Sequence, residues 1–356
     1  MSTIAKKIIA ASGEGGADPF EPVSGQFTKG LIMGTSDATA IDVLDVSSMS
    51  FKDNLSSSAF SIGYGSAVDT SQDFAFFVNS SSDGITLVDF SNINNVVIKD
   101  TLTDSVKLNS PRDVDVDSAN EVVFATSRYD DFINAIDYST PTAMSFISSL
   151  DLGRSVTEVK LDVARDVAYV LSSGRCFCVD ISNTSSMSIL QSAGGSTIWD
   201  INGGIVLDTT NDYQFAAHPT NNRVVVLNTA NTASIVYISL VASSTNLNGA
   251  SKLAIDVSKN LVFCLGTDVL SVIDYSTISS MTIQDTVTNT AFGTGSRRSL
   301  AVDTARELIF VAARSESNDV LVYDYSDPTS LTLADTISGT SSTTDGGQVV
   351  LSSPAA

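Results

Sequence analysis

Residues 66–102, SAVDTSQDFAFFVNSSSDGITLVDFSNINNVVIKDTL, decide the fold. They divide into four short apolar segments, at 66–69, 74–78, 85–89 and 96–102, separated by turns rich in Ser, Asn, Asp and Gly. Short β-branched and aromatic segments between such turns are typical of β-strands. The second segment is apolar throughout, as expected of a strand that is covered on both faces. The stretch therefore predicts a four-stranded unit packed between similar units.

The same unit recurs along the chain. An Asp is followed seven positions later by Phe or Tyr in six pairs: Asp69/Phe76, Asp117/Phe124, Asp162/Tyr169, Asp208/Phe215, Asp256/Phe263 and Asp303/Phe310. A second Asp or Asn follows each aromatic residue, and a seventh copy lies near the N-terminus: Asp45, Asp89, Asp137, Asp180, Asn228, Asp274 and Asp324. Successive copies of this second residue are 43 to 50 positions apart. Four strands in a period of this length predict a β-propeller.

The two ends of the chain explain how the ring closes. The first unit has its second strand at 31–33 and its third at 40–44, but no preceding first strand. The C-terminal segment 348–352 is a surplus strand, and its pairing into the first blade would remove the open edge. We expect an all-β fold, a seven-bladed propeller of four-stranded blades that spans residues 26–356. Residues 1–25 are predicted to be a separate N-terminal attachment arm.

Charge narrows the choice of partners. The chain has 19 Lys and Arg residues against 40 Asp and Glu, a net charge of −21. A field of this sign repels nucleic acid and anionic membranes, so neither is an expected partner. No apolar run approaches the length of a membrane span or a secretion signal. The three cysteines, Cys176, Cys178 and Cys264, are predicted to be buried thiols.

Motifs for catalysis are scarce. The one histidine, His218, lies beside Pro219 in an expected hairpin, and no nucleophile elbow or phosphate-binding loop accompanies it. The repeated aspartates are predicted to accept hydrogen bonds from backbone amides in turns. The residues therefore predict no catalytic residue, no metal site and no cofactor.

Two resemblances add to this interpretation. The segment 111–125, PRDVDVDSANEVVFA, with Ala135-Ile-Asp137, resembles propeller repeats of the LVIVD and YVTN type, and the likeness extends over about nine-tenths of the chain. The leader 1–19, MSTIAKKIIAASGEGGADP, resembles those of virion proteins of marine tailed phages, especially cyanophages. The second resemblance implies an attachment arm that leads into a displayed domain.

On this basis the expected function is non-enzymatic. The chain would be a structural protein of a phage particle, made in the host cytoplasm and displayed on the tail or capsid as a docking or host-adhesion module. The arm would bind tail or capsid subunits through two basic and three aliphatic side chains: Ile4, Lys6, Lys7, Ile8 and Ile9. A host receptor or glycan would contact the loops at Trp199, Arg297 and Arg298.

Two alternatives stay open. One is a non-viral propeller that binds protein or glycan. The other is a lactonase-like hydrolase that depends on Ca²⁺ held near the propeller axis. For the second, Glu158, Trp199-Asp200 and Arg297-Arg298 are placed where they could approach the axis, but the sequence does not show that they converge.

Overall fold

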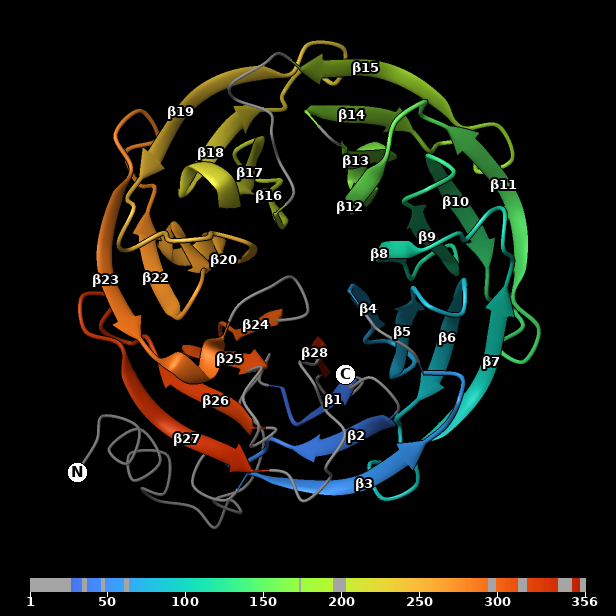
Figure 1. The fold of residues 1–356 in the computed structure, drawn as a ribbon, viewed down its shortest axis with the longest axis horizontal. Helices are drawn as coiled ribbons and strands as arrows, with labels where there is room; N and C mark the ends of the chain where they lie inside the picture. Colours follow the sequence, from blue (N-terminus) through green and yellow to red (C-terminus); the bar gives the residue numbers. More distant parts are fainter. Residues whose placement is uncertain are drawn as a thin grey trace, which may run out of the picture.

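The computed structural model describes residues 27–33, 37–45, 49–60, 64–172, 174–194, 203–293, 299–312, 319–338 and 348–352. Seven four-stranded sheets stand around a central axis (Figure 1). Every pairing between neighbouring strands is antiparallel. The predicted seven-bladed propeller is confirmed.

Each blade is named here from its innermost strand to its outermost. Blade 1 comprises β28 (Gln348–Ser352), β1 (Lys29–Met33), β2 (Asp37–Asp42) and β3 (Ser50–Ser56). Blade 2 comprises β4 (Ser66–Asp69), β5 (Phe74–Asn79), β6 (Gly84–Asp89) and β7 (Val97–Thr103). Blade 3 comprises β8 (Pro111–Asp117), β9 (Val122–Ser127), β10 (Phe132–Asp137) and β11 (Ser145–Asp151). Blade 4 comprises β12 (Val156–Asp162), β13 (Val167–Ser172), β14 (Arg175–Asp180) and β15 (Ser188–Gly194).

The remaining blades follow the same plan. Blade 5 comprises β16 (Ile205–Asp208), β17 (Tyr213–His218), β18 (Arg223–Asn228) and β19 (Val236–Ala242). Blade 6 comprises β20 (Lys252–Asp256), β21 (Leu261–Leu265), β22 (Val269–Asp274) and β23 (Thr282–Thr288). Blade 7 comprises β24 (Ser299–Asp303), β25 (Leu308–Ala312), β26 (Asp319–Asp324) and β27 (Thr332–Ser338). In the connections that the structure describes there are four single-turn 3₁₀ helices: η1 (Val163–Arg165), η2 (Pro219–Asn221), η3 (Val257–Lys259) and η4 (Thr290–Phe292).

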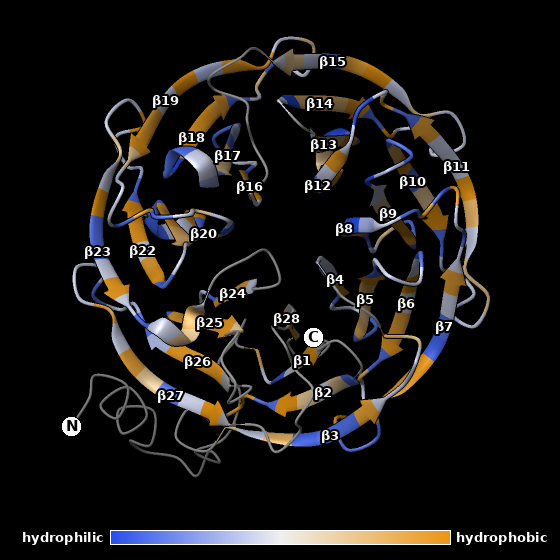
Figure 2. Cartoon of the chain, viewed as in Figure 1, coloured by the Kyte–Doolittle hydropathy of each residue, from blue (hydrophilic) through white to orange (hydrophobic). Residues whose placement is uncertain are grey.

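The hydrophobic core lies between the blades. The second strands β5 and β13 are buried at every position, as their continuous apolar sequences predict. The outermost strands carry hydrophilic stretches, seen for example on β3, β7 and β23, whereas β14 and β22 are largely hydrophobic (Figure 2). Each of the seven apolar clusters joins two adjacent blades; one of them packs Phe76 of blade 2 against Val123 of blade 3. Within the described residues, no helix is long and apolar enough to cross a membrane.

The ring closes as predicted. Strand β28 pairs with β1, with Gly30 opposite Leu351 and Leu31 opposite Val350. The Thr28 amide extends this pairing by donating to the Ser352 carbonyl at 3.0 Å. At Gly30 a Cβ atom would lie 2.8 Å from the Val350 carbonyl oxygen, so only glycine allows this close approach. One sheet thus joins the two ends of the propeller.

The repeated aspartates do act in turns. Asp208 Oδ1 accepts from the amides of Thr210 and Asn211, and Asp69 Oδ1 accepts from the amide of Ser71. The second set behaves in the same way: residues two positions on donate their amides to Asp89, Asp137, Asp180, Asn228, Asp274 and Asp324. The predicted turn role is confirmed for these residues. In blade 1 the equivalent residue is Asp42, which ends β2 and accepts the Leu44 amide, and not the predicted Asp45. Asp162 also differs from the prediction, because its Oδ2 accepts from the Arg165 side chain.

The first set also joins adjacent blades, which the sequence analysis did not foresee. The hydroxyls of three buried tyrosines donate to the Asp of the preceding blade: Tyr138 to Asp69 at 2.9 Å, Tyr275 to Asp208 at 3.0 Å and Tyr325 to Asp256 at 2.8 Å. Each tyrosine ring also packs against the aromatic residue seven positions after that Asp, with centroids 4.6 to 4.7 Å apart. Because the Asp and the aromatic residue are seven positions apart in each of these blades, both are in place to contact one tyrosine of the next blade. The Asp accepts its hydroxyl and the aromatic ring packs against its ring.

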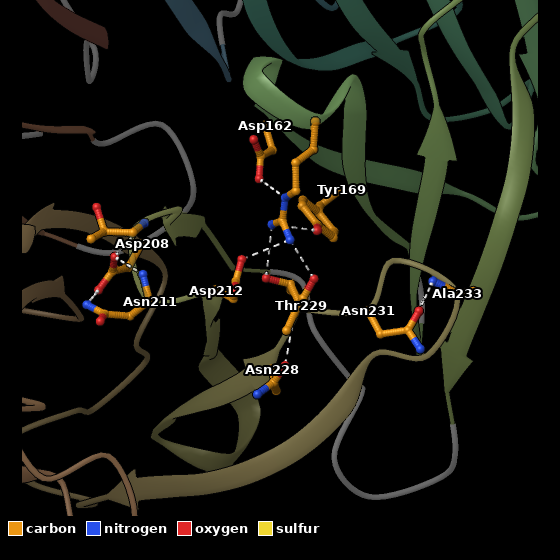
Figure 3. A network of polar contacts seen from close by, with 12 residues as sticks. Asp162, Tyr169, Asp208, Asn211, Asp212, Asn228, Thr229, Asn231 and Ala233 are labelled. Carbon is orange, nitrogen blue, oxygen red and sulfur yellow. Dashed lines mark hydrogen bonds and ion pairs between the residues drawn. The ribbon is translucent and has the colours of Figure 1, made fainter.

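Arginine replaces tyrosine between blades 4 and 5 (Figure 3). The Arg165 Nε donates to Asp162 Oδ2 at 2.6 Å, and its Nη1 donates to the Thr229 carbonyl at 2.8 Å. The same Nη1 lies 2.9 Å from Asp212 Oδ1. Arg306 plays this part between blades 7 and 1, because it binds Asp303 Oδ2 at 2.7 Å and the Phe27 carbonyl at 2.9 Å. Within the described residues, a Tyr or Arg side chain that donates to an Asp of the first set therefore spans five of the seven joints between blades.

These contacts predict unequal costs for two tyrosine substitutions. In Tyr325→Phe, Asp256 Oδ2 loses the one donor that reaches it within the described residues, and we expect a loss of about 1–3 kcal/mol in the free energy of unfolding. In Tyr275→Phe, Asp208 Oδ2 keeps the Asn211 side-chain amide at 2.8 Å, so the loss should be smaller. Urea unfolding measures both. Tyr129→Phe, at a side chain that is 65% exposed, is the control, and equal losses in all three variants would contradict the expectation.

Candidate functional site

A cavity of about 340 Å³ lies on the propeller axis. Its wall is formed by the innermost strands of all seven blades, together with Phe27. Small-ligand sites commonly measure about 300–1,000 Å³, so this cavity has room for a small molecule. The axial channel is therefore the first place to look for chemistry.

Ionisable side chains enter this cavity from three blades. Four positions before the Asp that ends each inner strand stand Asp113 in β8, Glu158 in β12 and Lys252 in β20. Two positions before it stand Asp115 in β8 and Lys160 in β12. Figure 2 shows β8 as a hydrophilic segment among the inner strands. The five charged residues thus form two levels along the axis.

Ion pairs connect these side chains. Lys252 Nζ lies 3.0 Å from Glu158 Oε1 and also donates to the Tyr64 carbonyl at 3.4 Å. The pair reaches from blade 6 to blade 4 and passes blade 5, which has Gly204 at the corresponding position. At the second level, Lys160 Nζ lies 3.5 Å from Asp115 Oδ1. Both lysines are therefore held in the channel by carboxylates.

The carboxylates also satisfy the inner edge of the next blade. Asp113 Oδ2 accepts from the Val159 amide at 3.0 Å, and Asp115 Oδ2 accepts from the Leu161 amide at 2.8 Å. Both donors belong to β12, whose inner edge has no further strand to pair with. These two aspartates therefore have a structural role in addition to any chemical one.

Irregularities in two inner strands set the position of the charged groups. The register of β8 shifts between Pro111 and Val114, and that of β12 shifts between Val156 and Glu158. Such β-bulges redirect side chains and are common beside functional sites. In β8 the Thr126 hydroxyl compensates for the lost pairing, because it accepts from the Asp113 amide at 3.0 Å.

Blade 2 packs directly against Asp113. A Cβ atom at Gly65 would lie 2.5 Å from the Asp113 Cα and 2.8 Å from the Arg112 carbonyl oxygen. The Arg112 guanidinium, 3.8 Å from the centre of the Tyr64 ring, covers the same joint. Asp113 is consequently buried, with 4% of the residue exposed.

This environment shifts the pKa values of the axial groups. Burial, and then the nearby Glu158 carboxylate, raise the pKa of Asp113 to about 7, against the lowering effects of Lys160, Lys252 and the Val159 amide. Burial also raises the pKa of Asp115, although Lys160 opposes the shift. Burial alone would lower the pKa of Lys160, but the Asp115, Asp113 and Glu158 carboxylates outweigh it and raise this pKa. At neutral pH, Asp113 can therefore gain or lose a proton beside two ammonium groups.

The axial residues do not fit a Ca²⁺ site. Within the ranges that the structure describes, no three His, Cys, Asp or Glu side chains gather closely enough to hold a metal ion. Glu158 and Asp115 are each committed to a lysine, which is not how oxygen ligands surround Ca²⁺. The arrangement instead combines a titrating carboxyl with cations, which is suited to proton transfer and to stabilising an anionic intermediate.

Some of the predicted site residues cannot be placed. The arm residues Ile4, Lys6, Lys7, Ile8 and Ile9, and the loop residues Trp199, Arg297 and Arg298, lie outside the described residues. Glu158, which the hydrolase alternative put near the axis, does line the axial cavity. His218 is fully buried at the end of β17, so it is not an exposed loop residue. The three cysteines are buried and unbridged, as predicted.

The sequence analysis missed four axial residues: Asp113, Asp115, Lys160 and Lys252. A signal for them was present. When the inner strands are aligned on their final Asp, these are the places where a charged residue stands in a segment that is otherwise small or aliphatic. The signal is weak, because Asp113 and Asp115 alternate with Val114 and Val116, a pattern that also fits a strand with one solvent-exposed face.

Comparison with known proteins finds likeness in fold alone. No protein-family model matches the sequence, and no curated protein matches it either. Among solved structures, a Bacteroides uniformis protein named provisionally as a 6-phosphogluconolactonase aligns with a TM-score of 0.74 and 10% identity, over 92% of this chain and all of that one. The periplasmic gluconolactonase PpgL of Pseudomonas aeruginosa aligns with a TM-score of 0.73 and 11% identity, over 90% of this chain and 99% of that one. A Lactobacillus plantarum protein aligns with a TM-score of 0.72 and 13% identity, over 91% and 99%.

These findings overturn the expectation of a non-enzymatic phage virion protein. The three propellers named above come from bacteria, and two of them carry the names of lactone-hydrolysing enzymes. The physical reason for the error is that the short glycine-rich leader says nothing about the chemistry of the propeller. The axial groups, which do carry chemistry, come together only in the folded ring. The names of two of these neighbours agree with the hydrolase alternative, and none of the three is named as a virion protein.

Proposed function

We propose that this propeller is a hydrolase that opens lactones in its axial cavity. One observation carries the proposal: the buried carboxyl of Asp113 has a pKa of about 7 and lines a cavity that also contains Lys160 and Lys252. A general base is most effective when its pKa lies near the working pH. Perturbed carboxyls in clefts are characteristic of active sites.

The residues define a simple reaction. The Asp113 carboxylate takes a proton from a water molecule as the water oxygen bonds to the lactone carbonyl carbon. The ammonium of Lys252 or Lys160 stabilises the negative charge that develops on the carbonyl oxygen. The ring C–O bond then breaks, and the leaving oxygen takes the proton back from Asp113. One lactone and one water give one hydroxy acid, and Asp113 returns to its starting state.

Support from the comparisons is limited to architecture. The gluconolactonase and the provisionally named 6-phosphogluconolactonase have the same overall fold as this chain, at 11% and 10% identity. Identity at this level transfers no residue roles, since one fold can host unrelated activities. The proposal therefore rests on the axial groups.

Catalysis should depend on Asp113. The purified protein is expected to open δ-lactones faster than buffer in a pH-stat assay, with kcat/KM rising from pH 6 to 8 because the base must lose its proton. Asp113→Asn should lower the rate by about 10²–10⁴-fold. Asp137→Asn, in a turn of blade 3 outside the cavity, is the control. No acceleration by the parent protein with any γ- or δ-lactone would refute the proposed function.

Stability should reveal the Asp113 pKa independently of activity. The ordinary pKa of this group is 3.8 and its folded value is about 7, so between these pH values the folded protein holds a proton that the unfolded chain lacks. The contribution of Asp113 to the free energy of unfolding is therefore largest below pH 3.8. It falls as pH rises towards 7, by at most about 1.4 kcal/mol per pH unit.

The test compares two urea-unfolding profiles against pH. Asp113→Asn cannot titrate, so its stability relative to the parent should increase from pH 4 to 7 and then level off. Taking the difference between the two proteins removes most of the contribution of Asp115, because burial is the main cause of its raised pKa and the Asp113 charge is a smaller one. Parallel profiles for the two proteins would mean that Asp113 ionises normally.

A further inference from the structure

The cavity has two chemically different halves. Its charged residues come from blades 3, 4 and 6. Blades 7, 1 and 2, which are consecutive around the ring, contribute aliphatic side chains instead: Ala67 and Val68 of β4, residues 300–302 of β24 and residues 349–351 of β28. We call these residues the aliphatic wall. Val68 and residues 300–302 are half-buried and line the same cavity as Asp113. Ala67 and residues 349–351 are more deeply buried, because they also belong to the apolar clusters between blades.

Few polar side chains interrupt the aliphatic wall. Among the described residues that line these three blades, the polar side chains are the hydroxyls of Ser66 and Ser299. Ser299 is already engaged, because its Oγ accepts from the Val349 amide at 2.6 Å. A ligand with many hydroxyl groups would therefore leave most of them without side-chain partners on this side, and unpaired buried polar groups are costly.

We propose that the substrate is a lactone that carries an alkyl substituent on its ring. The inference rests on the proposed function and adds the substrate class. The lactone carbonyl would lie among Asp113, Lys160 and Lys252, and the alkyl chain would pack against the aliphatic wall. Each methylene group removed from water there contributes about a fourfold gain in binding or rate. Polyhydroxylated sugar lactones should be poor substrates.

A series of lactones that share one ring size and differ in the length of their alkyl substituent tests this proposal. We would measure kcat/KM for δ-lactones with hydrogen, methyl, propyl or pentyl at the carbon beside the ring oxygen, and for D-glucono-1,5-lactone. The expected result is a rise of about fourfold per methylene until the cavity is filled, with the sugar lactone below the propyl compound. A flat or falling series with the sugar lactone fastest would overturn the alkyl inference and leave the hydrolase proposal intact.

A pair of matched variants locates the effect. Val302 lines the cavity and is half-buried, and it directly precedes Asp303 at the end of β24. Val302→Thr places a hydroxyl in the aliphatic wall and should reduce the preference for pentyl over hydrogen severalfold. Val116→Thr makes the same change at the equivalent position of β8, outside the cavity lining, and should leave the preference unchanged. Equal effects of the two variants would contradict the proposed location.

Binding of lactams separates this inference from catalysis. A δ-lactam has the same ring size but resists hydrolysis. Calorimetry with the pentyl-substituted and unsubstituted lactams therefore measures how much the aliphatic wall adds to binding affinity, independently of catalysis. Tighter binding of the pentyl lactam, weakened by Val302→Thr, would support the inference even if no lactone were opened. Equal affinities, or no binding of either compound, would overturn it.

Discussion

The innermost strand of every blade has an edge that no further strand can cover. Backbone amides on such an edge need acceptors when they are buried. Side chains of the preceding blade supply them: Asp113 and Asp115 accept from β12, and Ser299 accepts from β28. This requirement brings carboxylates to the axis of a protein whose core is otherwise apolar. The proposed chemistry depends on it, because the buried acceptor Asp113 is also the group with the near-neutral pKa.

Aspartates of the first set hold adjacent blades together outside the channel. Asp69, Asp208 and Asp256 end their own inner strands and also accept a hydroxyl from the next blade. Burial and the neighbouring Asp256 carboxylate raise the pKa of Tyr325, so the phenol remains a donor. Where tyrosine is missing, Arg165 and Arg306 take its place. These five interblade joints therefore all use an Asp of the first set as acceptor, and the donor is either a tyrosine or an arginine.

The sequence predicted the fold well because the fold depends on local spacing. Predicted strands at 74–78 and 348–352 correspond to β5 (Phe74–Asn79) and β28 (Gln348–Ser352). The interblade contacts were not predictable in the same way, since Tyr325 lies 69 residues from Asp256. Pairing such residues requires knowledge of which blades are adjacent and which face each strand presents. Sequence periodicity predicts which blades are adjacent, but it does not predict which face each strand presents to its neighbour.

The candidate site was harder still to predict. Lys252 and Glu158 are 94 residues apart, and blade 5, which lies between their blades, has Gly204 at the corresponding position. The position four residues before the final Asp differs from blade to blade and is occupied by Gly65, Asp113, Glu158, Gly204, Lys252 or Ser299. At Gly65 and Gly204 a Cβ atom would crowd the backbone of the next blade. Asp113 and Ser299 accept backbone amides of the next blade, whereas Glu158 and Lys252 pair with each other. Single substitutions at Glu158 or Lys252 can therefore change which ligands the channel accepts while the rest of the ring stays the same.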